Sequence, residues 1–408
     1  MNVIITPSKL TGAVTPPASK SQSHRLVIAA ALAQGTSRIG NLSRSEDIDA
    51  TLDCMAALGA RWEAGAITGV SAGRAGEGPL PRLDCRESGS TLRFLIPVAL
   101  ALRGGGVFTG KGRLLRRPME PYEKLFRDRG IFYQAGEEQI VVKGELKAGN
   151  YTLPGDVSSQ FITGLLFALP LLDGESELTL TTPLQSAGYV DMTLEALDQF
   201  GVRVEKLANG WRIQGPQRPQ AGERRAEGDW SQAAFYYAAR GLGNPVEIWG
   251  MNPDSAQGDR IIRAYAGQLN GTGTVTLDVS QCPDLAPALA VHAALRAGET
   301  THIVGGARLR MKESDRIEAI TSELNKLGAQ VTQTADSMTI RGVSALNGGE
   351  TDSHNDHRIA MMLAIAATRS RGPVLIRDAG SVAKSYPHFW EDYQMLGGRI
   401  AVSDSQRR

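Results

Sequence analysis

The stretch that decides the fold is 125-LFRDRGIFY-133, in which a helical pattern, a glycine and a short β-type run follow one another. Five other stretches have the same order: MAALGARWE at 55–63, LDQFGVRVE at 197–205, GQLNGTGTVTL at 267–277, LNKLGAQVT at 324–332 and YQMLGGRIAV at 393–402. The glycines at these junctions are Gly59, Gly130, Gly201, Gly271, Gly328 and Gly397. Their spacings are 71, 71, 70, 57 and 69 residues. This regularity indicates six copies of one structural unit.

Each copy also contains an earlier, more apolar helix. In 165-LLFALPLLDGESELTL-180, for example, an apolar helical run ends near a glycine and a β-type run follows. A unit of about 70 residues therefore contains helix, strand, loop, helix and strand, with a further strand leading to the next unit. Helices that are apolar on nearly all sides are buried, and six units cannot share one layer. The sequence predicts an α/β (α+β) fold of two domains with three units each.

The domain boundary is predicted between the third and fourth units, close to 224-RRAEGDWSQAAF-235. The opening MNVIITPSKLTGAV contains a strand that belongs to no unit. We therefore assign residues 15–227 to the first domain, and residues 1–14 plus 228–408 to the second.

Composition narrows the class of protein. The 408 residues carry a formal charge of +1, so no global field favours nucleic acid or membrane as a partner. Three cysteines without CxxC spacing argue against a disulfide framework or a zinc site and suit a reducing compartment. Without an apolar leader or a membrane-length run, a cytoplasmic protein is expected. Nucleotide-loop, dinucleotide, zinc-protease and α/β-hydrolase motifs are missing, and the histidine spacing predicts no metal site.

Polar residues crowd the start of an apolar helix in 19-SKSQSHR-25. A serine is a good N-cap, but capping uses one hydroxyl, and the first turn of a helix favours carboxylates over cations. Lys20 and Arg25 are better explained by an anion bound at the helix N-terminus.

The repeat places similar groups at equivalent positions of the other units. The first helices begin at 21–23, 88–90, 158–160, 230–232, 283–284 and 356–358. The loops before the second helices carry Arg113, Arg117, Ser186, Tyr189, Lys312, Glu313, Arg316 and Lys384. If like ends of the units pack together, these groups face one cleft between the domains, where converging helix termini and cations hold anions.

Each group also has a structural interpretation. Asp284 is either an N-cap or a base close to a substrate hydroxyl. Lys312 beside Glu313 is either a helix-surface charge pair or an acid/base pair. The basic stretch 111–117 is either a solvated face or a loop that closes over a substrate.

Nine motifs in order along nearly the whole chain resemble the 3-phosphoshikimate 1-carboxyvinyltransferase family, also called 5-enolpyruvylshikimate-3-phosphate synthases. They are SKSQSHR (19–25), ESGSTLR (87–93), GRLLRRP (112–118), DVSSQF (156–161), SAGYVDMT (186–193), EGDWSQAAF (227–235), KESDRI (312–317), NDHRIAM (355–361) and AKSYPHF (383–389). The resemblance implies two inside-out domains of three βαβαββ units that close on their ligands. It also implies transfer of the enolpyruvyl group of phosphoenolpyruvate to the 5-hydroxyl of shikimate 3-phosphate, without metal or organic cofactor, in a monomer that is a glyphosate target.

The resemblance also implies residue roles. Catalytic roles would belong to Asp284, Glu313, Lys20 and Lys312. Shikimate 3-phosphate would contact Ser21, Arg25, Ser158, Ser159, Gln160, Ser186, Tyr189, Asp284 and Lys312. Phosphoenolpyruvate would contact Lys20, Gly89, Arg117, Gln160, Arg316, His357, Arg358 and Lys384.

Two positions depart from many relatives. Glu87 stands where asparagine is common, and Phe94 where some relatives have proline. A carboxylate beside an anionic substrate needs a neighbouring cation, and we expect Arg86 or Arg117 to supply it. One alternative is a UDP-N-acetylglucosamine 1-carboxyvinyltransferase. That family usually has a cysteine in its mobile loop, and the corresponding stretch 107–120 has none. The other alternative is a non-catalytic anion-binding relative. A nucleic-acid-binding module is disfavoured by the charge balance.

Overall fold

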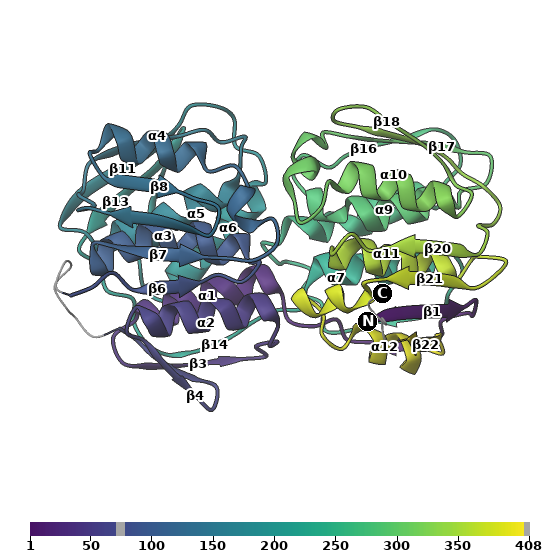
Figure 1. Cartoon of the computed structure of the whole chain (residues 1–408), viewed down its shortest axis with the longest axis horizontal. Coiled ribbons are helices and arrows are strands. Elements are labelled where there is room, and N and C mark those ends of the chain that lie inside the picture. Colours follow the sequence, from purple (N-terminus) through teal and green to yellow (C-terminus); the bar gives the residue numbers. More distant parts are fainter. Residues whose placement is uncertain (71–77, 404–408) are drawn as a thin grey trace. The chain divides into compact units, whose positions relative to one another are not determined.

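The computed structural model describes residues 1–70 and 78–403, and its contacts divide the chain into two compact units (Figure 1). The N-terminal unit is Ala18–Glu227, and the C-terminal unit is Met1–Pro17 together with the chain from Gly228 onward. The first crossing thus follows Pro17, whereas the sequence analysis placed it after residue 14. Pro17 stays with the C-terminal unit because its carbonyl accepts a hydrogen bond from the Asp229 backbone N–H at 2.9 Å.

The N-terminal unit contains three four-stranded sheets with the same topology. Their orders are β14–β3–β5–β4, β6–β7–β9–β8 and β10–β11–β13–β12. In each, the first pair is parallel and the other two pairs are antiparallel. The strands are β3 (Thr36–Gly40), β4 (Arg61–Glu63), β5 (Ala66–Thr68), β6 (Arg82–Asp84), β7 (Gly105–Thr109), β8 (Phe132–Ala135), β9 (Gln139–Lys143), β10 (Asn150–Leu153), β11 (Gly174–Leu180), β12 (Glu205–Leu207), β13 (Gly210–Gly215) and β14 (Glu223–Arg225).

The C-terminal unit repeats this topology twice, in β16–β17–β19–β18 and β20–β21–β1–β22. The opening strand β1 takes the third position of the second sheet, with Val3 opposite Ile376 and Val402. A two-stranded sheet, β15–β2, completes the unit. These strands are β1 (Asn2–Thr6), β2 (Gly12–Val14), β15 (Val246–Ile248), β16 (Val275–Asp278), β17 (Thr300–Val304), β18 (Gln330–Gln333), β19 (Met338–Arg341), β20 (Gly349–Asp352), β21 (Val374–Arg377) and β22 (Arg399–Ser403).

The fourth repeat is reduced. Its predicted closing strand forms, as β16, but it pairs in parallel with β17 of the following repeat. Within the described chain, no hairpin follows α8 (Ile262–Leu269), although hairpins follow the second helices of the first, second, third and fifth repeats. The missing hairpin explains why Gly271 and Gly328 are 57 residues apart, whereas the other spacings are 69 to 71.

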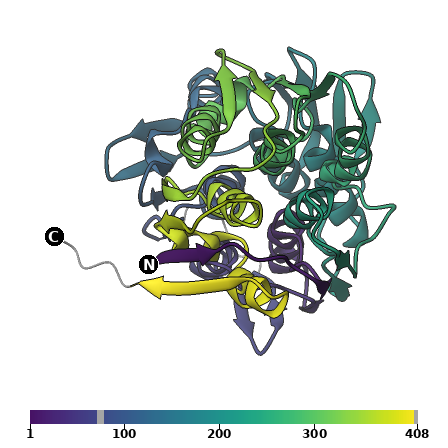
Figure 2. The same ribbon diagram turned by 90° about the vertical axis from the view of Figure 1, so that its right-hand side faces the viewer.

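The first helix of each repeat is the more buried one, as the sequence predicted. These helices are α1 (Lys20–Leu32), α3 (Gly89–Arg103), α5 (Ser159–Ala168), α7 (Trp230–Gly241), α9 (Ala286–Ala294) and α11 (His357–Ala367). Every residue of α9 and of α11 is buried. In the C-terminal unit α7, α9 and α11 contact one another, and Figure 2 shows helices of this unit nearly end-on. Their N-termini carry the predicted site residues, so the core itself positions them.

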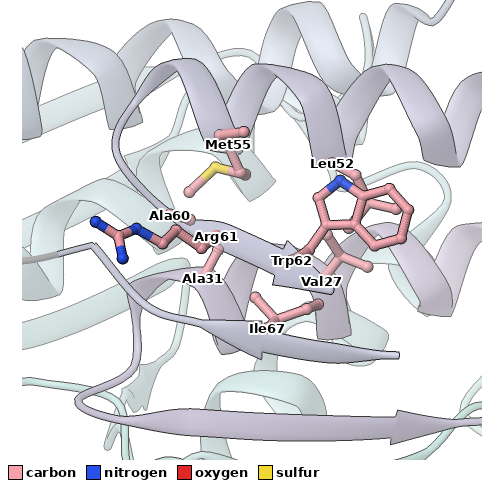
Figure 3. A pocket seen from close by; sticks show the side chains of 9 residues that line it. Val27, Ala31, Leu52, Met55, Ala60, Arg61, Trp62 and Ile67 are labelled. Atoms are coloured by element: carbon pink, nitrogen blue, oxygen red, sulfur yellow. The ribbon is translucent and has the colours of Figure 1, made fainter. Parts of the chain in front are cut away.

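The second helices have more exposed residues than the first: α2 (Glu46–Ala57), α4 (Glu120–Asp128), α6 (Ala187–Gln199), α8, α10 (Arg316–Lys326) and α12 (Phe389–Met395). In the N-terminal unit, an apolar pocket lies where the β4–β5 hairpin covers α1 and α2 (Figure 3). Val27, Leu52, Met55, Trp62 and Ile67 line it, with Arg61 at its edge. No predicted site residue lines this pocket, and its apolar walls do not suit an anion. Among the helices described, none is long and apolar enough to cross a membrane.

Candidate functional site

Serine or aspartate caps five of the six predicted helix starts, those of α1, α3, α5, α7 and α11. Ser19 Oγ accepts the Gln22 N–H, Ser88 Oγ accepts the Thr91 N–H, and Ser158 Oγ accepts the Gln160 N–H, at 3.2 to 3.3 Å. Asp356 caps α11. In α1 the cap uses Ser19 alone and leaves Lys20, Ser21 and Arg25 with other roles. Asp284 is no such cap: the residue before α9 is Leu285, and its side chain makes no capping hydrogen bond.

Lys20 pairs with a carboxylate on the next helix. Its Nζ lies 2.8 Å from Asp47 Oδ2, and both side chains are largely shielded from solvent. Asp47 belongs to the first turn of α2, where a carboxylate is also favoured by the helix dipole. This partner was missed in the sequence, although three acidic residues in one first turn were a visible signal.

The Arg25 side chain, on α1, lies against α6 and is 1% exposed. Its Nε donates to Thr193 Oγ1 and its Nη2 to the Tyr189 carbonyl, both at 2.8 Å. The guanidinium lies over the rings of Phe94 and Tyr189, 5.1 and 6.0 Å from their centroids. Burial lowers the pKa of Arg25 to about 9, so it stays protonated at neutral pH. In the part of the chain that the structure describes, no carboxylate pairs with it, which suits an arriving anion.

Gly89, Arg117 and Gln160 come together from three segments. A Cβ on Gly89 would lie 2.6 Å from Arg117 Nη1 and 3.6 Å from Gln160 Oε1. Gln160 is held in turn: its Nε2 donates to Ser90 Oγ at 3.0 Å, and its Oε1 accepts from Arg93 Nη1 at 2.8 Å. Arg93 was missed as a site residue although it ends the quoted motif ESGSTLR.

The remaining predicted residues of the N-terminal unit lie at helix starts. Ser159 is the first residue of α5. Ser186, in the left-handed region at φ 57°, precedes α6, whose first turn contains Tyr189. Glu87 lies against the following loop, where a Cβ on Gly112 would be 2.9 Å from Glu87 Oε1. Arg86, one of the two expected partners of Glu87, instead pairs with Asp53 at 2.7 Å.

Asp284 is the centre of the cluster in the C-terminal unit. Its carboxylate lies 2.8 Å from Arg316 Nη1, 3.3 Å from Lys312 Nζ and 3.1 Å from Arg358 Nη2. Burial lowers the pKa of Lys312, although the carboxylate of Asp284 acts against this. A carboxylate held among three cations and close to a lysine whose pKa is lowered is suited to proton transfer.

Arg316 links the carboxylates of this cluster. It is 1% exposed and donates to Asp284, Glu313 and Asp356, each at 2.8 Å. Burial acts to lower its pKa, but the three carboxylates raise it above the ordinary value. Its guanidinium is thus engaged by side chains of this unit. This geometry favours a role in positioning Asp284 and Glu313.

The start of α11 brings His357 and Arg358 to the same cluster, both nearly buried. Lys384, at the end of the short helix η6 (Ala379–Lys384), donates from Nζ to the Asn355 carbonyl at 2.7 Å. The residues predicted in this unit therefore gather around one helix N-terminus. That both clusters face one shared cleft stays a prediction.

Asp259 is a buried carboxyl that the sequence analysis missed. It belongs to the short helix η3 (Gly258–Ile261) and accepts a hydrogen bond from Ser231 Oγ, in the first turn of α7. Burial and the charge of Asp284 raise the pKa of Asp259 to about 7. The fourth repeat thus adds a buried carboxyl with a raised pKa next to the cluster around Asp284.

In the residues that the structure describes, no group of three or more His, Cys, Asp and Glu could hold a metal ion.

Cations at the starts of buried helices, beside carboxylates in proton-transfer range, define an enzyme that acts on small, multiply charged anions. The comparisons with known proteins give the family. The family model EPSP synthase (3-phosphoshikimate 1-carboxyvinyltransferase) matches residues 4–393. The chain therefore belongs to the 3-phosphoshikimate 1-carboxyvinyltransferase family, and the resemblance seen in its motifs is confirmed.

Individual relatives agree in sequence and in fold. The 3-phosphoshikimate 1-carboxyvinyltransferase of Clostridioides difficile (strain 630) is 44% identical, over 97% of both chains. That of Clostridium kluyveri is 45% identical, over 98% of both chains. The structure of EPSP synthase from Acinetobacter baumannii superposes with a TM-score of 0.79 at 29% identity, covering 99% of this chain and 100% of that chain. The predicted two-domain α/β fold and the prediction of an enzyme are thereby confirmed.

Proposed function

We propose that this protein transfers the enolpyruvyl group of phosphoenolpyruvate to the 5-hydroxyl of shikimate 3-phosphate and releases phosphate, as a step of aromatic amino acid biosynthesis. The observation that carries the proposal is the cluster around Asp284, where a carboxylate, Lys312 and Arg358 meet at buried helix starts. The two substrates bring two phosphates and two carboxylates, which require several cations and helix N-termini.

The N-terminal unit supplies the binding groups for shikimate 3-phosphate. Arg25 is a buried cation whose contacts in the described chain are to neutral oxygens, so a phosphate or carboxylate can complete its surroundings. Ser158, Ser159 and Ser186 add hydroxyl groups at helix starts, where backbone N–H groups also point toward an anion. We assign these residues, with Ser21, Gln160 and Tyr189, to this substrate.

Phosphoenolpyruvate is assigned to cations of both units. Gly89 leaves the space that Arg117 Nη1 approaches, and Gln160 lies beside it. We place Lys20, Arg117, Arg358 and Lys384 around its carboxylate and phosphate, with His357 as a neighbour. Arg316 contributes to this site through the carboxylates that it holds. Closure of the two units would then exclude water from the activated enol.

The proposed chemistry is addition followed by elimination. Asp284 takes the proton of the 5-hydroxyl while the hydroxyl oxygen bonds to C2 of phosphoenolpyruvate. Glu313 or Lys312 delivers a proton to C3. The resulting tetrahedral intermediate loses a proton from C3 and expels phosphate, so the enol ether forms and the proton balance closes. Cations around the leaving phosphate stabilise its developing charge.

The test is phosphate release from phosphoenolpyruvate with and without shikimate 3-phosphate. Release that requires shikimate 3-phosphate supports the proposal. Release that requires UDP-N-acetylglucosamine would instead assign the other enolpyruvyl transfer. Binding of both anions without turnover would indicate a non-catalytic relative. We further propose that the protein works in the cytoplasm as a monomer, without metal or organic cofactor. Sedimentation tests the monomeric state, and assays in the presence of a chelator test the independence from metal.

A further inference from the structure

The loop before α11 has an unusual backbone. His354 and Asn355, two successive non-glycine residues, have φ values of 53° and 54°. Left-handed conformations are unfavourable for side chains with a Cβ, so the surrounding contacts must hold this loop. The loop leads directly into Asp356, His357 and Arg358, which makes its conformation important for the site.

A buried carboxylate on α10 holds the loop. Glu323 is fully buried and accepts hydrogen bonds from His354 Nε2 at 2.7 Å, from the Asp352 backbone N–H at 2.9 Å and from Lys326 Nζ at 2.8 Å. Burial acts to raise its pKa, but the hydrogen bonds from His354 and Lys326 lower the pKa to about 2. Because Glu323 is a carboxylate at any working pH, the shared proton of this contact belongs to His354.

The other side of the loop contacts the proposed phosphoenolpyruvate site. The Asn355 carbonyl accepts a hydrogen bond from Lys384 Nζ at 2.7 Å. The next residue, Asp356, accepts from Arg316 at 2.8 Å and from Ser314 at 3.0 Å, and caps the helix that carries Arg358. A movement of the loop would therefore displace Lys384 and the start of α11 together.

His354 is the titratable link in this arrangement. The hydrogen bond to Glu323 raises its pKa above the ordinary 6.5, partial burial opposes this, Asp352 adds to the increase and Lys326 reduces it. The neighbouring strand β21 contributes Arg377, which pairs with Asp352 in the sheet register and forms an ion pair with Glu350. A protonated imidazole makes a charge-assisted bond to Glu323, about twice as strong as a neutral one.

We propose that His354 and Glu323 form a positioning pair for the phosphoenolpyruvate-binding loop, and that protonation of His354 strengthens phosphoenolpyruvate binding. The inference rests on the proposed function, because it places Lys384 and Arg358 against that substrate. It predicts that KM for phosphoenolpyruvate rises as His354 loses its proton. The value of kcat and the KM for shikimate 3-phosphate depend on other residues and change little.

The kinetic test compares His354→Gln with His388→Gln. His388 is a matched control, because it also pairs with a glutamate, Glu391, at 2.8 Å, but both of these side chains are largely exposed. In the wild type and His388→Gln, KM for phosphoenolpyruvate should rise about three- to tenfold between about pH 6 and pH 9, the scale of one charge-assisted hydrogen bond. In His354→Gln it should start high and lack this inflection. Equal profiles for all three proteins would overturn the proposal.

A second measurement does not depend on activity. NMR titration of the histidine Cε1–H signals should give His354 a pKa above 6.5, and Glu323→Gln should lower it. An ordinary or depressed value for His354 in the wild-type chain would refute the pairing. If the wild type releases no phosphate at any pH, the proposed function fails, while the titration still decides whether the pair exists.

Discussion

Replacing Asp284 by asparagine tests the proposed function most directly. The substitution keeps the shape of the side chain but removes the charge that Arg316, Lys312 and Arg358 surround at 2.8 to 3.3 Å. An amide cannot accept the hydroxyl proton. Loss of a general base costs about 100- to 10,000-fold in kcat, or roughly 3 to 5 kcal/mol in the activation barrier.

The same substitution should have a smaller effect on folding. Three cations lose a carboxylate at a site that is 14% exposed, and the amide oxygen still accepts a hydrogen bond. We expect the C-terminal unit to lose about 1 to 3 kcal/mol in free energy of unfolding. Urea denaturation followed by tryptophan fluorescence measures this change separately from turnover.

Asp315→Asn is the matched control for Asp284→Asn. Asp315 also pairs with an arginine, Arg310, at 2.8 Å, and caps α10. Asparagine caps a helix as well as aspartate does, so this variant should stay within about twofold of wild-type kcat. The assay is phosphate release at saturating concentrations of both substrates. If Asp284→Asn keeps more than about a tenth of the wild-type kcat, its role as the proton acceptor is refuted.

Four further substitutions probe the site and its surroundings. Gly89→Ala pushes Arg117 Nη1 away from a Cβ only 2.6 Å distant, so KM for phosphoenolpyruvate should rise about tenfold without loss of stability, in steady-state assays. Gly164→Ala, which meets the Arg93 carbonyl at 2.5 Å, should instead lower the unfolding midpoint, and the reverse pattern would contradict both expectations. Arg25→Lys should raise KM for shikimate 3-phosphate about tenfold or more, because a lysine cannot reproduce the planar contacts; isothermal titration with that substrate checks this. In the folded chain the pKa of Glu323 is lowered from 4.5 to about 2. Its contribution to the free energy of unfolding, roughly 3 kcal/mol, is therefore complete above pH 4.5 and is lost as the pH falls toward 2. Glu323→Gln should flatten this acid dependence in urea titrations, and an unchanged slope would count against the expectation.

The repeat could be predicted from the sequence because it is written in local signals. A glycine after a helix and a β-type run after the glycine depend on neighbouring residues alone. Even the reduced fourth repeat left a trace, the spacing of 57 residues between Gly271 and Gly328. The missing hairpin could not be assigned from that number, because strand pairing is a tertiary property: β16 satisfies its backbone against β17 instead.

The partners of the charged residues could not be predicted. Lys20 pairs with Asp47 on a different helix, and Arg316 pairs with Asp356, which is 40 residues away in the chain. Glu313 lies in the same segment as Arg316, but it is only one of the three carboxylates that Arg316 contacts. The residue types at the helix starts could therefore be predicted from the sequence, but the ion pairs that these residues form could not.

The two interpretations of the helix starts turn out to be compatible, because they use different atoms. The cap residue satisfies one N–H of the first turn with its own side chain, as Ser19 and Asp356 do. The side chains that follow it can therefore contact other groups, and in α11 Arg358 pairs with Asp284 at 3.1 Å. A capped helix start with cations just after the cap thus combines a stable terminus with a place for an anion. The chain has this arrangement at the starts of α1 and α11, whereas the first residues of α3, α5 and α7 are Gly89, Ser159 and Trp230.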